Sequence, residues 1–345
     1  MSPSATTPSA LDVQNQQPTV RVALSRVGVA SVEKVIRVGR PGAEVPYLAT
    51  FETVVDLGPH QKGAHMSRFE EVVNGVIAEE IVGDGSGGAT PSGAAPGRAV
   101  RAEHLARRVA QVVRERQGAR RAEVRLTARY PEERPAPVSG IASQEIFTLH
   151  GIAVATETGA RTVTGVTAQG MTACPCAQEH LRDSSVGRLR ESGFDDEQIA
   201  AILEAVPVAT HNQRGLGTLL IGRPEGGDGV DVDALDLVRV VEESMSAEIY
   251  ELMKRSDEGT VVEKAHRNPR FVEDCVREML RGVVERFGGL ADDAFVLAKQ
   301  ENLETIHQHD VVAERYGTLG ELRAEIGQGV EPAQHTSLRQ WLDAQ

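Results

Sequence analysis

Two cysteines and a histidine in the middle of the chain are the residues best suited to chemistry. Cys174 and Cys176 lie in the stretch GMTACPCAQ, and His211 lies in THNQRG. Thiolate and neutral imidazole are ligands that a borderline divalent cation prefers, and a catalytic metal typically keeps about three protein ligands and one open position. The spacing lacks the paired Cys-x2-Cys and His-x3-His of structural zinc motifs. It predicts a metal site completed by a carboxylate; the alternative is that both cysteines pack as small apolar side chains.

A basic segment near position 65 is a second candidate site. Its sequence, HQKGAHMSRFEEVV, contains Lys62, His65, Ser67 and Arg68 and runs into an apolar-periodic helix. A glycine turn at a helix start presents backbone N–H groups beside cations, an arrangement that suits phosphate oxygens. The segment is not a Walker loop, and a solvated helix start is the alternative interpretation.

Two carboxylates further along the chain are candidate ligands. Glu273 shares a helical stripe with Val276 and Leu280, so the spacing turns it toward the apolar side, where it needs either a salt bridge or a ligand's N–H groups. Glu258 follows a helix predicted over 234–254. We expect it in a loop, as a metal-facing residue or as part of a solvated turn.

The segment ENLETIHQHD places two imidazoles close together near the end of the chain. His307 and His309 are two residues apart, hence on one face if the backbone is extended, and Glu304 precedes His307 by three. Such imidazoles can ligate a metal, transfer protons or hold phosphate. An incidental pair is the alternative.

Hydrophobic periodicity predicts the elements that position these residues. We expect two strands within 19–57 and further strands at 122–130, 146–156, 161–169, 216–223 and 294–298. We expect helices after residue 65 and over 100–117, 195–205, 234–254 and 271–287. The order of elements repeats, which divides the chain into a tail (1–18), a first half (19–130) with a flexible loop (84–97), a second half (143–325) and a C-terminal tail (326–345).

Composition limits the setting. The 345 residues, 40% of them apolar, suffice for one large domain or two of ordinary size. Three cysteines are too few for a disulfide scaffold, and the N-terminus has neither a basic start nor an apolar run, so we expect an uncleaved, disordered tail on a cytoplasmic protein. No apolar stretch approaches the roughly 20 residues that span a membrane. The net charge of -13 argues against nucleic-acid binding.

Taken together, the motifs resemble the type IB GTP cyclohydrolases, in the branch that includes the archaeal enzymes of pterin synthesis. The resemblance runs in order through DVQ, KGAHMSRF, GMTACPCAQ, THNQRG, EIYELMKRSDE, NPRFVED and ENLETIHQH, and so covers nearly the whole chain. The long interval between Cys176 and His211 is similar to the archaeal type.

The resemblance implies an α+β tunnelling fold, with two tandem halves of antiparallel sheet backed by helices, in a barrel-like homotetramer with sites between subunits. It also implies one divalent metal per site, Fe(II), Mn(II) or Zn(II), held by Cys174, His211 and Glu258. In the same family, the residue that matches Glu273 anchors guanine.

The implied reaction is metal-dependent hydrolysis of GTP at guanine C8 with release of formate. The product would be 7,8-dihydroneopterin triphosphate or its 2′,3′-cyclic phosphate, at the first step of folate or pterin synthesis. Residue chemistry suggests catalytic roles for Cys174, His307 and His309, and substrate binding by Glu304, Lys62, His65, Ser67, Arg68 and Arg214. The alternatives are a non-catalytic purine or pterin binder on the same fold and a hydrolase with Cys174 as nucleophile.

Overall fold

The structure, a computed structural model, describes residues 13–14, 16–38, 45–82, 101–224, 226, 230, 232–330 and 332–344. The chain forms two compact units. Unit 1 comprises Met1–Thr127 and Gly151–Thr162, and unit 2 comprises Ala128–His150 and Val163–Gln345. Most of the tail predicted over 1–18 and the whole loop predicted over 84–97 lie outside the described residues.

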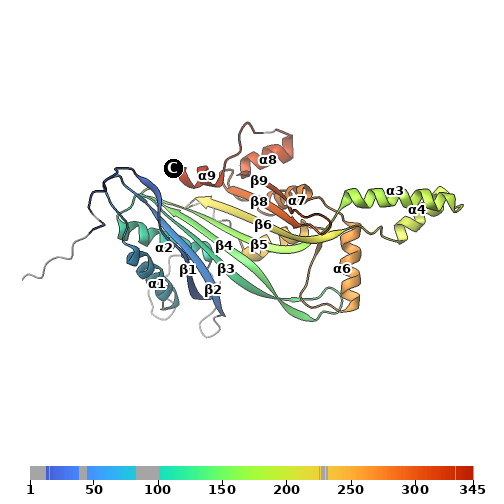
Figure 1. The fold of residues 1–345 in the computed structure, drawn as a ribbon, viewed down its shortest axis with the longest axis horizontal. Helices are drawn as coiled ribbons and strands as arrows, with labels where there is room; N and C mark the ends of the chain where they lie inside the picture. Colours follow the sequence, from blue (N-terminus) through green and yellow to red (C-terminus); the bar gives the residue numbers. More distant parts are fainter. Residues whose placement is uncertain are drawn as a thin grey trace, which may run out of the picture. The chain divides into compact units, whose positions relative to one another are not determined.

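Unit 1 places two helices on a sheet (Figure 1). Strands β1 (Leu24–Val38) and β2 (Val45–Leu57) pair antiparallel, and β3 (Ala122–Pro135) follows β2 in the sheet. Helices α1 (Met66–Val82) and α2 (Ala102–Gln117) pack on each other and on β1 and β2. In α2 the apolar residues recur every four positions, at Leu105, Val109 and Val113, and all three are buried. The strands and helices predicted for this region are confirmed.

Unit 2 contains the larger part of the sheet. Its strand order is β3-β4-β5-β6-β8-β9, with β7 pairing to β5. The strands are β4 (Ala142–Ala155), β5 (Ala160–Ala173), β6 (Asn212–Pro224), β7 (Ala247–Glu248), β8 (Phe295–Leu303) and β9 (Val311–Thr318). Strands β6 and β8 pair antiparallel, with Arg214 opposite Leu303 and Leu219 opposite Ala298.

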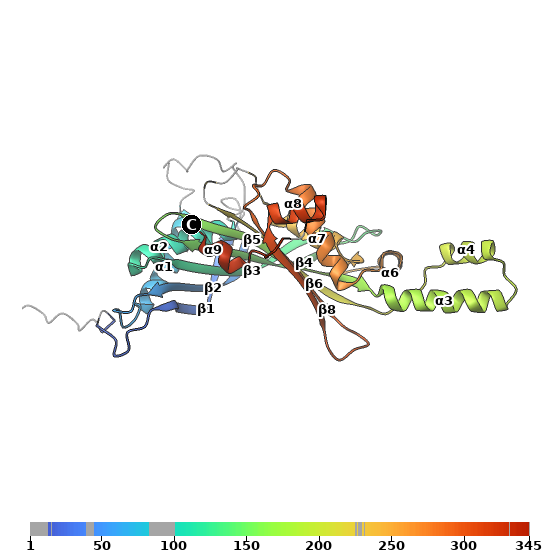
Figure 2. The same ribbon diagram turned by 90° about the horizontal axis from the view of Figure 1, so that it is seen from above.

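Helices cover one face of this sheet and form the core of unit 2 with it (Figure 2). They are α5 (Ala234–Glu243), α7 (Val272–Arg286) and α8 (Leu319–Gln328). Helix α6 (Arg255–Arg267) packs in a smaller cluster with Ala247, and α9 (Leu338–Asp343) places Trp341 against Phe295. Leu237, Met245 and Met279 are among the buried residues that pack against Leu219 and Val296 of the sheet. The architecture is therefore α+β, with an antiparallel sheet backed by helices.

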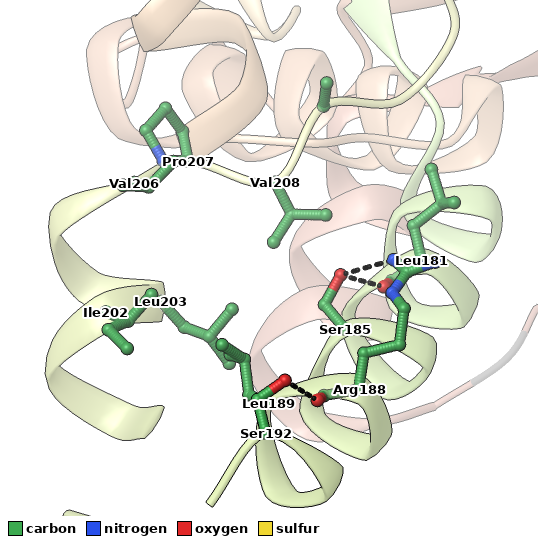
Figure 3. Close-up of a pocket in the computed structure, with 11 residues that line it drawn as sticks. Leu181, Ser185, Arg188, Leu189, Ser192, Ile202, Leu203, Val206, Pro207 and Val208 are labelled. Carbon is green, nitrogen blue, oxygen red and sulfur yellow. Dashed lines mark hydrogen bonds between the residues drawn. The ribbon is translucent and has the colours of Figure 1, made fainter. Parts of the chain in front are cut away.

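A helical hairpin projects from the rest of unit 2 in both ribbon views (Figures 1 and 2). Its helices are α3 (Pro175–Glu191) and α4 (Asp196–Ala205), and the start of α4 is fixed by a capping box between Asp195 and Gln198. An open groove of about 500 Å³ lies between the two helices, lined by residues such as Leu181, Leu189 and Ile202 (Figure 3). None of the candidate site residues lines this groove.

The long helix predicted over 234–254 is wrong, because α5 ends at Glu243. Beyond it the chain leaves the helical path and pairs with β5, where Met171 lies opposite Ala247. Ser246 joins the two segments, since its N–H donates to Met171 O and its hydroxyl accepts from Ala173 N–H. This pairing outweighs the helical periodicity of the sequence. No helix in the described part of the chain is long and apolar enough to cross a membrane.

Candidate active site

Cys174 and His211 meet where two neighbouring strands end and begin. β5 ends at Ala173 and β6 begins at Asn212, so both residues lie just outside the sheet. The Cys174 N–H donates to His211 O at 3.1 Å, and the Thr210 hydroxyl donates to Cys174 O at 3.0 Å. The two strongest metal-ligand candidates are therefore held together by backbone contacts, although 36 residues separate the hydrogen-bonded Thr210 and Cys174.

The three thiols have different surroundings. Cys174 is half-buried and occupies the N-cap position of α3, where the helix dipole favours negative charge, whereas Cys176 is exposed one residue beyond Pro175. Cys275 is buried in α7, and burial raises the pKa of its thiol to about 12. Cys275 is thus an unreactive core residue, and Cys174 is the cysteine whose backbone contacts His211.

A carboxylate lies beside the ring of His211, and an amide holds that carboxylate. Nδ1 of His211 is buried without a hydrogen-bond partner among the described residues. It lies 3.9 Å from Glu304 Oε2, and the two side chains are 14% and 6% exposed. The other oxygen of Glu304 accepts a hydrogen bond from Gln213 Nε2 at 3.0 Å. The sequence had suggested Glu304 only as a substrate ligand, and it gave no indication of Gln213.

Other polar residues of the same motifs hold the backbone around this pair. Gln178 donates from Nε2 to Val208 O at 2.8 Å and to His266 O at 2.6 Å, and so joins α3 to the segment before His211 and to the end of α6. The Arg270 N–H donates to Ala173 O at 3.0 Å, while its guanidinium donates to Ser244 O at 2.7 Å. These residues were not among those predicted from the sequence. Their polar character inside motifs assigned to chemistry was the available signal.

Glu258 lies in a helix, which corrects the loop predicted for it. It is exposed in the first turn of α6. The neighbouring Asp257 ties the start of this helix to the segment between β3 and β4, because its carboxylate accepts from the N–H groups of Val138 and Ser139 and from the Ser139 hydroxyl. Burial alone would raise the pKa of Asp257, but these hydrogen bonds and one from Lys254 N–H hold it below its ordinary value.

No group of three His, Cys, Asp or Glu residues with metal-binding geometry occurs within the described part of the chain. The completion of the ligand set by Glu258 therefore stays a prediction. What the structure assembles is the pair of Cys174 and His211, with Glu304 behind the imidazole.

Glu273 is exposed, so the prediction that it faces the apolar side of its helix is wrong for the single chain. At about 100° per residue, the buried arc of α7 runs through Val272, Val276 and Met279 and reaches its border at Leu280. Glu273 falls just outside that border. It makes no hydrogen bond or ion pair with the other described residues, and so it is available to a ligand.

His307 and His309 lie side by side in the segment between β8 and β9. Their rings stack with centroids 5.2 Å apart and planes 14° apart, and both side chains are exposed. The backbone here bends and is not extended, so stacking accounts for the proximity of the rings. The segment is anchored to β6 by the Thr305 hydroxyl, which donates to Asn212 O at 3.2 Å. Arg214, two residues further along β6, is exposed.

The basic segment belongs to unit 1, and its backbone differs from the predicted phosphate cradle. Lys62 N–H donates to Gln14 O and Gln16 O, and Gly63 N–H also donates to Gln14 O. The His65 N–H donates to the side chain of Gln117. These N–H groups already donate hydrogen bonds within the chain and are not free to bind phosphate.

The side chains of the basic segment are still accessible in part. Lys62 and Ser67 are exposed, while His65 and Arg68 are partly buried. The Arg68 guanidinium donates to Arg116 O at 3.1 Å. Any phosphate binding by this segment would rest on these side chains.

Comparison with known proteins defines the class of this enzyme. The family described as type I GTP cyclohydrolase folE2 matches residues 11–313. The GTP cyclohydrolase MptA of Methanococcus aeolicus is 42% identical over 322 residues, covering 91% of this chain and 99% of that protein. The MptA of Methanocaldococcus jannaschii is 40% identical, covering 91% and 97%. The chain therefore belongs to the type I GTP cyclohydrolase family, whose members are enzymes that act on GTP.

The solved structures that the chain matches are distant in sequence. A uricase from Arthrobacter globiformis shares 10% identity, with a TM-score of 0.47 over 86% of this chain and 95% of that chain. A uricase from Bacillus fastidious shares 8% identity, with a TM-score of 0.41 over 85% and 88%.

Proposed function

We propose that this chain is a metal-dependent GTP cyclohydrolase of the IB type, which hydrolyses GTP at guanine C8 and releases formate. The observation that carries the proposal is the backbone hydrogen bond between Cys174 and His211, which brings a cysteine and a histidine together, with the buried Glu304 carboxylate beside the imidazole. The product is 7,8-dihydroneopterin triphosphate or its 2′,3′-cyclic phosphate, and the reaction is the first step of folate or pterin synthesis.

The donors of the site fit a borderline divalent cation. The unpartnered Nδ1 of His211 faces Glu304, which suits an imidazole whose other nitrogen is a metal ligand. Cys174, His211 and Glu258 would hold Fe(II), Mn(II) or Zn(II). Such an ion, when bound, lowers the pKa of a coordinated water so that hydroxide is available near neutral pH.

The remaining roles belong to side chains of the chain itself. The Glu273 carboxylate accepts the N–H donors of guanine and so orients C8. The stacked His307 and His309 transfer protons during ring opening, and both are accessible to substrate. The triphosphate is held by the accessible basic and polar side chains, namely Lys62, His65, Ser67, Arg68 and Arg214.

We further propose that the subunits form a homotetramer of tunnelling folds with sites between subunits. The exposure of Glu258 and Glu273 in the single chain supports this arrangement. A carboxylate that lies on the surface of one subunit can complete a site on another, which accounts for the lack of a three-residue group within the described part of one chain.

The test is turnover of GTP by chelator-treated protein to which one metal at a time is returned. Formate release and mass spectrometry of the product identify the reaction, and its mass distinguishes the triphosphate from the cyclic phosphate. We expect no activity without metal and recovery with Fe(II), Mn(II) or Zn(II). Full activity of metal-free protein, or a trapped covalent adduct on Cys174, would instead support the nucleophilic hydrolase.

A further inference from the structure

A row of buried polar side chains runs along β8 toward the imidazole of His211. Gln300 and Asn302 alternate along the strand and therefore share one face, and Glu304 follows directly after its last residue, Leu303. Gln300 is 0% exposed and Asn302 is 2% exposed. The Gln300 Nε2 donates to Asn302 Oδ1 at 3.0 Å. Burying such polar groups costs free energy unless they are hydrogen-bonded.

The facing strand β6 makes space for this row. Gly215 and Gly217 pair with Asn302 and Gln300, and a Cβ atom on Gly215 would collide with the Gln300 amide nitrogen. Gln213 is the next residue on this face of β6, and it is 6% exposed. The glycines thus admit the polar side chains, and Gln213 is the member of the β6 face that reaches Glu304.

We propose that Gln213 is a positioning residue for the metal-binding imidazole, an inference that rests on the proposed metal site. Its amide N–H₂ engages Oε1 of Glu304 at 3.0 Å. The carboxylate is thereby oriented so that Oε2 faces Nδ1 of His211, 3.9 Å away.

The chemistry of Gln213, Glu304 and His211 explains how this contact would favour metal binding. An amide nitrogen only donates, so Gln213 fixes which oxygen of Glu304 stays available to the imidazole. A carboxylate beside Nδ1 favours the tautomer that carries its proton there, and Nε2 then keeps the lone pair for a metal. Nδ1 has no hydrogen-bond partner within the described residues, and the Glu304 carboxylate faces it at 3.9 Å. Glu304 is therefore the group that can set the tautomer.

Cobalt(II) binding to the full-length protein tests the inference without reference to turnover. The absorption of a cobalt–thiolate site gives the affinity directly. Gln213→Met removes the donor but nearly preserves side-chain volume, and Gln300→Met makes the same change at a buried position of the same face that does not touch Glu304. We expect Gln213→Met to weaken Co²⁺ binding by about 10- to 100-fold. Gln300→Met should stay within about twofold of the parent protein.

A second pair of variants covers the case in which Gln213→Met does not fold. Gln213→Glu places two carboxylates together and should also weaken Co²⁺ binding. Adding Glu304→Gln restores a donor and an acceptor between the two positions and leaves a carbonyl oxygen toward His211. We expect the double variant to recover most of the affinity that the single variant loses.

Different failures have different meanings. If the parent protein binds Co²⁺ but Gln213→Met binds it equally well, or Gln300→Met is as weak as Gln213→Met, then Gln213 is a structural residue only. A double variant no better than Gln213→Glu also contradicts the inference. If the parent protein has no Co²⁺ site involving Cys174, the proposed metal function fails and the positioning role fails with it.

Discussion

Replacement of Gln178 by alanine should loosen the segment that carries His211. The side chain donates two hydrogen bonds, to Val208 O at 2.8 Å and to His266 O at 2.6 Å. A neutral hydrogen bond contributes about 0.5–1.5 kcal/mol to stability, so the loss of both predicts a destabilisation of about 1–3 kcal/mol. Because Val208 lies three residues before His211, metal affinity should fall together with stability.

Urea unfolding followed by tryptophan fluorescence is a suitable assay. The chain has a single tryptophan, Trp341, which is buried in unit 2 and donates from its indole nitrogen to Asp293 O at 2.7 Å. Its signal therefore reports on the unit that contains Gln178. The control is Gln198→Ala in the exposed capping box of α4, which should cost about 0.5 kcal/mol or less. Equal midpoints for Gln178→Ala and Gln198→Ala would refute the reasoning.

The other predictions concern ligands and pH. Cys174→Ala should lose bound metal and turnover, whereas Cys176→Ala should keep most of its metal by elemental analysis; the reverse result would identify Cys176 as the ligand. Glu273→Gln should weaken GTP binding by about 2–4 kcal/mol in titration calorimetry with metal content unchanged, since guanine N–H groups lose a charged acceptor. Arg68→Ala should penalise GTP far more than guanosine; equal losses would show that Arg68 does not contact phosphate. Burial lowers the pKa of His150 to about 4, below the value of about 6.5 in the unfolded chain. The stability that it contributes is therefore complete above about pH 6.5 and is lost as pH falls toward 4, by at most about 3 kcal/mol. In His150→Gln, the free energy of unfolding should depend less on pH between about 6.5 and 4. A pH dependence parallel to that of the parent protein would show that His150 is not responsible.

Elements with a self-contained apolar pattern could be predicted from the sequence. Helix α7 begins within one residue of its predicted start because its buried positions repeat at helical spacing. The end of α5 could not be predicted in this way. It depends on pairing between Met171 and Ala247 and on the guanidinium of Arg270, which donates to Ser244 O. These contacts join residues far apart in the chain, so the local apolar periodicity does not indicate them.

In the candidate site, too, some features could be predicted from the sequence and others depend on contacts between distant residues. Cys174 and His211 were selected by residue type, and the structure brings their backbones together. The position of Glu304 behind His211 depends on the register of β6 and β8, in which Arg214 lies opposite Leu303. A shift of one residue would turn Gln213 to the other face of the sheet. The spacing of charged residues along a sequence cannot reveal such a contact.

The topology of unit 2 explains why residues so distant in sequence meet at one place. β5, β6 and β8 are neighbours in the sheet, β5 ends at Ala173, β6 begins at Asn212 and β8 ends at Leu303. Because strands that run in alternating directions bring the end of one beside the start of the next, Cys174, His211 and Glu304 all emerge at the same edge of the sheet. Their backbone positions are set by the hydrogen-bonded strands, while the residues themselves lie just beyond them and can contact a ligand. Long insertions between these strands, such as the α3–α4 hairpin, are compatible with the site because they do not alter where the strands end.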